Sequence, residues 1–221
     1  MSHQIVEIAR SPVSVAMDRA PIGSLPCEGT GLGLRNERSV RVRPVRPADA
    51  ETIQEFVRRL SVTSRRRRFF SPIRELTPAM LARITNSAGR GRVLIAEAHD
   101  GETGCMVAMA QYAPSDDDGG TCELALVVAD AWQRLGLGRS LLEMLIQSAR
   151  DARYVRAVAD VLHENEAMLA LGRAYNFSVV HSPYDATMLR LVRDLQRAAP
   201  TERAWIPAGS ASRARPTEAV A

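Results

Sequence analysis

The chain of 221 residues contains no lysine, and all 29 of its basic side chains are arginine. A Walker-type phosphate loop needs a lysine that reaches the phosphates, so that class of nucleotide site is excluded. Aromatic residues are also scarce, at 5% of the chain. Surfaces that bind single-stranded nucleic acid combine basic and aromatic side chains. Because the arginines here are dispersed and lack interleaved aromatics, we expect no nucleic-acid partner despite a net charge of +4.

Cysteine is equally scarce. Cys27, Cys105 and Cys122 have neither metal-binding nor redox spacing, and their odd number argues against a disulfide framework. No grouping of His, Cys or carboxylate residues has the spacing of a metal site, so we expect no metal. The chain also lacks a signal-peptide pattern and any apolar run near the roughly 18 residues that span a bilayer. These absences predict a cytoplasmic protein that does not enter a membrane.

A regular series of strand and helix patterns lies between two irregular ends. We interpret residues 1–38 as an N-terminal extension or linker, with Gly29, Gly31 and Gly33 in the linker and a short strand at 4–8. Residues 198–221 are predicted to be a disordered tail. Residues 39–197 are predicted to form a single α/β domain. Its strands are expected at 39–45, 93–98, 106–112, 122–128, 155–161, 177–180 and 187–192, and its helices at 49–60, 64–70, 77–84, 138–153 and 165–174.

The most informative segment follows the strand at 122–128. Gln133, Gly136 and Gly138 stand between that strand and a long helix pattern. Glycines let backbone N–H groups approach an anion without a Cβ in the way, and the helix N-terminus adds a partial positive charge. The junction therefore predicts a phosphate or pyrophosphate site. A simple tight turn stays open as an alternative, whereas a dinucleotide fold is disfavoured because Leu141 stands where its third glycine is needed.

The pattern Gln-x-x-Gly-x-Gly resembles the acyl-CoA pyrophosphate loop of the GNAT acetyltransferases. Residues 41–49 resemble the first strand and helix start of that family, and 160–177 its fifth strand and following helix. The resemblance covers about residues 40–195. It implies a single GNAT-like domain with a mixed, mostly antiparallel sheet flanked by helices, and acetyl-CoA as co-substrate. The cofactor contacts that it implies are Leu126, Val127, Val128, Gln133, Arg134, Leu135, Gly136, Leu137, Gly138, Arg139, Ser140 and Asn165.

A narrower resemblance concerns the acceptor. Residues 43–47, Leu60-Ser61, Ser64, 68–70 and 75–78 are similar to the GNAT domain of bacterial protein lysine acetyltransferases. This similarity implies that the acceptor amine is a protein lysine. Since the chain has no lysine, it cannot acetylate its own lysine side chains.

The chain departs from the family pattern at four positions. Arg134 replaces a frequent glycine and Leu135 a frequent basic residue, which weakens charge pairing to the cofactor. Gly172 stands where many relatives carry a tyrosine that acts as general acid. Asn176 replaces a glycine, a tolerable change because asparagine also adopts the left-handed conformation. In a chain of this length we expect no attached sensor domain.

Glu123 is the candidate general base. It lies within an otherwise apolar strand, where partial burial raises a carboxyl pKa toward useful values. The resemblance implies the same role, with proton transfer through water. The alternative is a carboxylate on a solvated face. His163 is a weaker candidate, and Tyr175 is predicted to pack in the core.

Arg65, Arg66, Arg67 and Arg68 form the one dense basic run. They are interpreted as a solvated helix face that pairs with Glu51, Glu55 and Glu75, or as a rim that meets an acidic partner or a CoA phosphate. Two other functions stay open: acetylation of a small amine, and a non-catalytic acyl-CoA-binding regulatory module. The module would need no buried carboxylate at Glu123.

Overall fold

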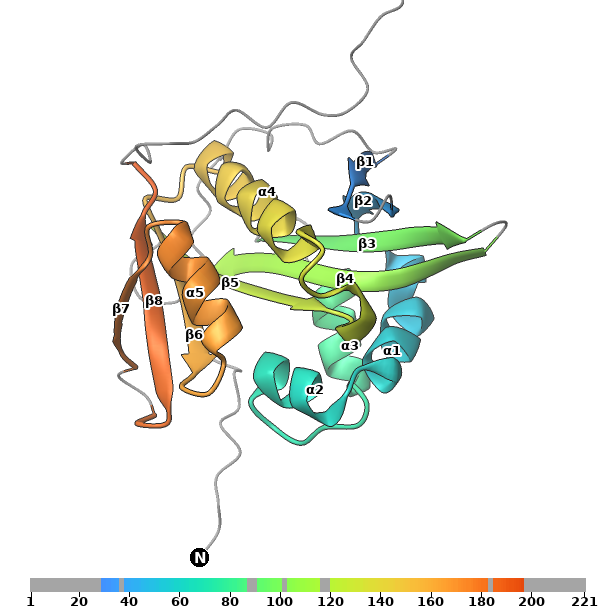
Figure 1. The fold of residues 1–221 in the computed structure, drawn as a ribbon, viewed down its shortest axis with the longest axis horizontal. Coiled ribbons are helices and arrows are strands. Elements are labelled where there is room, and N and C mark those ends of the chain that lie inside the picture. The colour runs from blue at the N-terminus through green and yellow to red at the C-terminus, as the bar shows by residue number, and fades with distance from the viewer. Residues whose placement is uncertain are drawn as a thin grey trace, which may run out of the picture.

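The computed structural model describes residues 29–35, 38–86, 91–100, 103–115, 120–182 and 185–196. The expected strand at 4–8, Cys27 and the expected tail at 198–221 lie outside these residues. One eight-stranded sheet has the order β1-β2-β3-β4-β5-β6-β8-β7. Its strands are β1 (Thr30–Gly33), β2 (Ser39–Pro44), β3 (Arg92–Asp100), β4 (Thr103–Pro114), β5 (Thr121–Val128), β6 (Arg156–Leu162), β7 (Ser178–His181) and β8 (Met188–Asp194) (Figure 1).

Helices cover both faces of this sheet (Figure 1). They are α1 (Ala50–Arg59), α2 (Val62–Phe69), α3 (Pro78–Thr85), α4 (Leu137–Asp151) and α5 (Glu166–Ala174), with short 3-10 turns η2 (Pro47–Asp49) and η3 (Asp130–Trp132). β5 and β6 pair in parallel, and every other described pair is antiparallel. The predicted mixed, mostly antiparallel α/β domain is confirmed.

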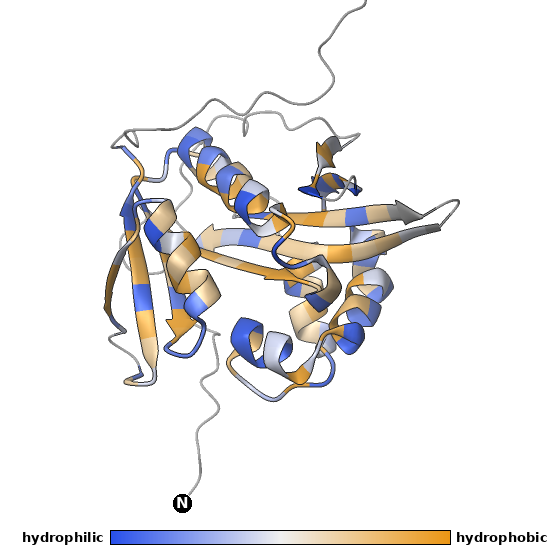
Figure 2. Cartoon of the chain, in the orientation of Figure 1, coloured by the Kyte–Doolittle hydropathy of each residue, from blue (hydrophilic) through white to orange (hydrophobic). Residues whose placement is uncertain are grey.

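The alternation of side chains along β5 divides the core into two parts. Val127 packs with Ile53 and Phe56 of α1 on one face. Leu124 and Val128 pack with Leu141 of α4 on the other. In Figure 2 the strands are mainly orange with blue interruptions, whereas α2 is largely hydrophilic. Glu123, which shares the face of Val127, therefore points toward the helices α1 to α3.

The helix starts follow local capping chemistry. Thr77 and Asn165 are the first residues of the helices expected at 77–84 and 165–174, and they cap α3 and α5 through their side chains. The predicted start of α2 at Ser64 is wrong by three residues, because the Ser61 hydroxyl accepts from the N–H of Ser64. Asp49 precedes α1 but makes no side-chain cap there. Its carboxylate instead accepts from the guanidinium of Arg43 at 2.7 Å and from the N–H of Arg46 at 2.6 Å, so it joins the end of β2 to the turn before α1.

The interpretation of Gly29, Gly31 and Gly33 as linker is wrong for residues 30–33. These residues form β1, which pairs antiparallel with β2 from Thr30↔Val42 to Gly33↔Ser39. Leu32 is buried in the α4-side core. A strand of four residues with two glycines carries too little alternation to be recognised from its own sequence.

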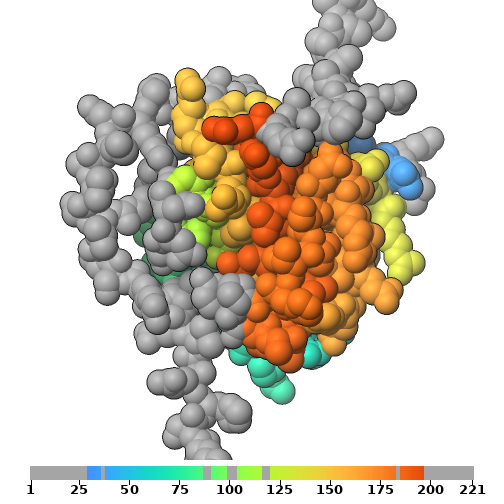
Figure 3. All heavy atoms as spheres, turned by 90° about the vertical axis from the view of Figure 1, so that its left-hand side faces the viewer, coloured from blue at the N-terminus to red at the C-terminus, as the bar shows by residue number. Residues whose placement is uncertain are grey.

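Figure 3 shows the C-terminal part of the domain, in orange and red, on one side of the molecule. In this part α5 packs against β8, the strand next to the edge strand β7. Their contact requires a glycine, because a Cβ at Gly172 would lie 2.6 Å from Cδ1 of Leu191, which is fully buried. The side chain of Leu191 therefore occupies the space beside Gly172, the position at which the family resemblance implies a tyrosine in many relatives.

We predict that Gly172→Tyr lowers the free energy of unfolding by at least about 2 kcal/mol, since the new side chain must displace Leu191. Urea unfolding measures the change, with Gly31→Tyr as control because a Cβ there meets no atom within 4 Å. Adding Leu191→Ala should recover part of the loss that Gly172→Tyr causes. If the two substitutions prove strictly additive, the contact does not govern this position.

Candidate functional site

The two parallel strands in the middle of the sheet separate part-way along their length. β5 and β6 pair only from Thr121↔Arg156 to Glu123↔Val158. Beyond that point β5 continues to Val128 and stays paired with β4, while β6 continues to Leu162 paired with β8. Beyond Glu123, the side of β5 that would pair with β6 therefore faces a gap.

Strand alternation decides which backbone groups of β5 face the gap. The N–H of Ala129 donates to Val107 of β4 at 2.8 Å, so the alternate residue Val127 also turns its backbone toward β4. Leu126 and Val128 turn theirs toward β6. Of the three residues expected to supply backbone contacts, Leu126 and Val128 fit that role and Val127 does not, because its backbone is used within the sheet.

The N-terminus of α4 lies beside this gap. Gly136 has φ +96°, which only glycine adopts readily, and an added Cβ at Gly138 would lie 3.8 to 3.9 Å from Val128 and Leu126. The first intrahelical bond runs from Ser140 N–H to Gly136 C=O. The N–H groups of residues 137–139 therefore have no acceptor inside the helix. These unpaired N–H groups form a cradle that suits an anion. The distances at Gly138 also show that the surrounding side chains leave room for a Cβ there.

Gln133 fixes the end of β5. Its side-chain amide donates to the carbonyl of Val128 at 3.0 Å and to Ser64 Oγ of α2 at 3.3 Å, and its own N–H donates to Asp130. Asp130 in turn accepts from the hydroxyls of Ser61 and Ser64. Burial acts to raise the pKa of Asp130, but these hydrogen bonds outweigh it and hold the pKa below its ordinary value. Gln133 is therefore placed to position the loop.

The β1–β2 hairpin supports the same loop from the other side. The N–H of Arg35 donates to the carbonyl of Leu135 at 3.2 Å. Arg38 donates to the carbonyl of Ala131 and lies 4.8 Å over the ring of Trp132. Sequence reasoning missed Arg35 and Arg38, because their partners lie about a hundred residues away.

The remaining expected contacts are distributed around the α4 N-terminus and the start of α5. Arg134 has a left-handed φ of 63° and is exposed. The side chain of Leu137 is fully buried, so only its N–H can face a ligand. Arg139 lies 5.6 Å over the ring of Tyr175, and Asn165 Oδ1 accepts from Met168 N–H.

Glu123 lies where β5 and β6 part. Its side chain is half-buried, and no described residue hydrogen-bonds to its carboxylate. Burial raises its pKa above the ordinary value of 4.5, and Asp160 raises it further, while Arg68, Arg190 and Arg83 act in the opposite direction. A carboxylate with a raised pKa and no bound donor is able to accept a proton.

The four consecutive arginines do not form a solvated face paired with Glu51 and Glu75. Arg58 takes those two carboxylates instead. Arg65 closes the end of α1 by donating to three carbonyls, of which Leu60 lies at 2.6 Å. Arg66 and Arg67 contact Glu164, just beyond the end of β6, and the guanidinium of Arg68 lies 4.9 Å from the centre of the Phe69 ring.

Neither Gly172 of α5 nor Tyr175 at its C-terminal end offers an unengaged acid. Gly172 has no side chain, and the hydroxyl of Tyr175 donates to Glu143 of α4. Burial and this hydrogen bond both raise the pKa of Tyr175. Tyr175 thus links α5 to α4.

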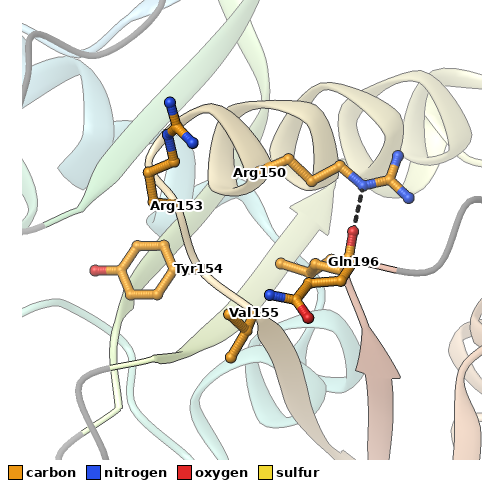
Figure 4. Close-up of a pocket in the computed structure, with 6 residues that line it drawn as sticks. Arg150, Arg153, Tyr154, Val155 and Gln196 are labelled. Atoms are coloured by element: carbon orange, nitrogen blue, oxygen red, sulfur yellow. Dashed lines mark hydrogen bonds between the residues drawn. The ribbon is translucent and has the colours of Figure 1, made fainter.

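A surface hollow of about 500 Å³ lies at the other end of α4, among Arg150, Arg153, Tyr154 and Gln196 (Figure 4). Arg150 is committed there to the carbonyl of Leu195 at 2.9 Å. Because α4 has 15 residues, this hollow is about 20 Å from Gly138. It contains no residue of the strand gap.

Comparison with known proteins identifies this arrangement. Residues 59–177 match the family model described as the Acetyltransferase (GNAT) family. The chain belongs to the GNAT family of acetyltransferases. It is 31% identical over 157 residues to an acetyltransferase of Pseudomonas aeruginosa, which covers 71% of this chain and 84% of the relative.

Two solved structures share the GNAT fold. The GNAT domain of S. lividans PAT matches with a TM-score of 0.67 and 26% identity over 75% of this chain and 96% of that one. YncA from Salmonella typhimurium, solved with its cofactor acetyl-CoA, matches with a TM-score of 0.57 and 23% identity over 74% and 98%.

As a GNAT acetyltransferase the chain uses acetyl-CoA as co-substrate. The gap and the α4 N-terminus fit acetyl-CoA. The backbone groups of β5 that face the gap suit the amide groups in the arm of acetyl-CoA, and the N–H groups at the α4 N-terminus suit its pyrophosphate. Among the described residues, no group of three or more His, Cys, Asp or Glu side chains is arranged to hold a metal ion. Within the same residues, no helix is both long and apolar enough to cross a bilayer.

We predict that Gly138→Glu weakens acetyl-CoA binding about tenfold or more, since a carboxylate beside the α4 N-terminus repels the pyrophosphate. Isothermal calorimetry measures the affinity. Gly31→Glu adds the same charge in open space on β1 and should bind acetyl-CoA as the parent does. Equal affinity of a folded Gly138→Glu protein would show that the pyrophosphate binds elsewhere.

Proposed function

We propose that this acetyltransferase acts on protein lysine side chains, and that Glu123 is its general base. The observation that carries the proposal is the half-buried carboxylate at the point where β5 and β6 separate, which accepts no hydrogen bond from any residue that the structure describes. The resemblance of residues 43–47, 68–70 and 75–78 to protein lysine acetyltransferases supports the acceptor, as does the likeness to the GNAT domain of S. lividans PAT. The expected cytoplasmic location belongs to the same proposal and rests on the cysteine pattern.

The chemistry needs a neutral amine. Glu123 removes the ammonium proton, through a water where direct contact is not made, and the amine then attacks the acetyl carbonyl carbon directly. In this proposal the backbone N–H groups of Leu126 and Val128, which face the gap, polarise that carbonyl. The C–N bond forms, the C–S bond breaks, and CoA leaves as a thiolate or takes a proton from water, because Gly172 and Tyr175 supply no acid.

The proposed base should leave a distinctive kinetic signature. Glu123→Gln is expected to lower kcat by about 10² to 10⁴-fold while leaving acetyl-CoA affinity unchanged. Steady-state rates with a lysine peptide and calorimetry with acetyl-CoA measure the two effects. Glu55→Gln, an exposed residue of α1, is the matched control. Wild-type kcat in Glu123→Gln across the pH range would assign the base to another residue.

The ionised carboxylate of Glu123 should lower the free energy of unfolding at neutral pH. Because the folded pKa of Glu123 is raised, its charged form is disfavoured in the fold, so the contribution to stability declines as pH rises through the folded pKa. Glu123→Gln is therefore expected to have an unchanged or higher Tm at pH 7, measured by thermal unfolding. The acid limb of kcat in the parent should lie above pH 4.5. A clearly lower Tm of Glu123→Gln would indicate a structural role.

A further inference from the structure

A second carboxylate, that of Asp160, lies on the same face of the sheet as Glu123. Backbone pairing places Glu123 of β5 opposite Val158 of β6, and Asp160 follows two residues later on β6. Residues opposite each other, and residues two apart on one strand, share a face, so both carboxylates point the same way. From one strand spacing and two residues of rise, their Cα atoms are about 8 Å apart or slightly more.

The carboxylate of Asp160 keeps part of its hydrogen-bonding capacity. Arg190 of β8 lies opposite Asp160, donating from Nε to Oδ1 at 2.8 Å and from Nη2 to Oδ2 at 2.7 Å. Each carboxylate oxygen can accept a second hydrogen bond. No other described residue donates to Asp160, and its side chain is 13% exposed, so a ligand can reach it.

The sheet face around this ion pair is open on the side of β7. Val180 of β7 pairs with Arg190, therefore shares its face, and is 46% exposed. On the other side, Arg66 of α2 reaches Glu164 just beyond the end of β6 at 2.9 Å. An acceptor can therefore approach over β8 and β6, beside α2, and arrive where β5 and β6 part.

Stability alone is a weak reason for an ion pair at this place, because desolvation of both charges offsets their attraction. The neighbouring cross-strand pair on the same face is apolar, Val158 with Val192. An apolar pair in place of Asp160 and Arg190 would continue that packing.

An amine gives the carboxylate of Asp160 a use. Two hydrogen bonds from one ammonium nitrogen join oxygens that are about 4.5 to 5 Å apart. Glutamate and aspartate side chains that point the same way from Cα atoms about 8 Å apart can place their oxygens at this separation. Asp160 is also close enough to raise the pKa of Glu123.

We propose that Asp160 is a binding residue for the acceptor amine, so that the carboxylates of Asp160 and Glu123 hold the ammonium group between them. Arg190 fixes the orientation of the Asp160 carboxylate. This inference rests on the proposed function insofar as Glu123 marks the acceptor side of the gap. Asp160 thereby selects acceptors that carry a positively charged amine, whereas Glu123 removes the proton before attack.

Calorimetry on the enzyme saturated with CoA tests the contact, because no acetyl group is present to be transferred. A lysine peptide should bind this complex about tenfold or more tighter than the same peptide with norleucine, in line with a hydrogen bond between charged groups. Asp160→Asn should abolish the preference and leave CoA affinity unchanged. Asp151→Asn, an exposed residue at the end of α4, should keep the whole preference.

Two further variants separate the contact from a structural role of the ion pair. Arg190→Gln breaks the same pair but keeps the carboxylate, so it should keep most of the preference. The double variant Asp160→Leu, Arg190→Met leaves no unpaired charge in the fold and should lose the preference. Equal loss in Asp160→Asn and Arg190→Gln, or full preference in Asp160→Asn or the double variant, overturns the inference.

The protein-lysine proposal fails separately. If the parent complex does not prefer the lysine peptide, the comparison is made with n-butylamine against n-butanol. A preference for the amine that Asp160→Asn removes still supports Asp160 and rejects the lysine acceptor. Absence of that preference overturns both.

Discussion

The structure depends on the short register between β5 and β6. Three pairs of residues hold the strands together, and beyond Glu123↔Val158 each strand follows its other neighbour. A continuous parallel pair would use the backbone groups of Leu126 and Val128 within the sheet. Their separation instead leaves hydrogen-bonding groups facing a gap in the middle of a well-packed domain. Unpaired backbone groups at such a place are expected to have a ligand.

Several polar contacts keep the gap in shape. Gln133 holds the carbonyl of Val128, and Asp130 joins the loop to the start of α2 through Ser61 and Ser64. Arg66 of α2 reaches Glu164 beyond the end of β6 at 2.9 Å. That last pair is about half exposed and so contributes little to stability. α2 thus contacts both sides of the gap, firmly at β5 and weakly at β6.

Features set by neighbouring residues could be predicted from the sequence. The caps at Thr77 and Asn165, the left-handed Asn176 and the glycines before α4 all follow from local backbone chemistry. Glu123 could be singled out because a carboxylate interrupts an apolar strand. The family pattern added the order of the strands, which no local signal provides.

Features set by distant partners could not be predicted. β1 was not recognised, because its stability comes from β2 and from the contacts of Arg35 and Arg38 with the glycine loop. The four arginines of α2 look alike in the sequence, but the fold gives them different roles. Only the three-dimensional arrangement shows that Arg65 closes the end of α1 while Arg66 and Arg67 reach Glu164.

The central claim is that acetyl-CoA occupies the gap between β5 and β6 and the α4 N-terminus. Amide hydrogen exchange with and without acetyl-CoA tests it most directly, because the method reports individual backbone N–H groups. The account predicts new protection at Leu126, Val128 and residues 137–139, with little change at Val127, whose N–H already faces β4. Protection confined to the hollow around Arg150 and Arg153, or none at Leu126 and Val128, would contradict it.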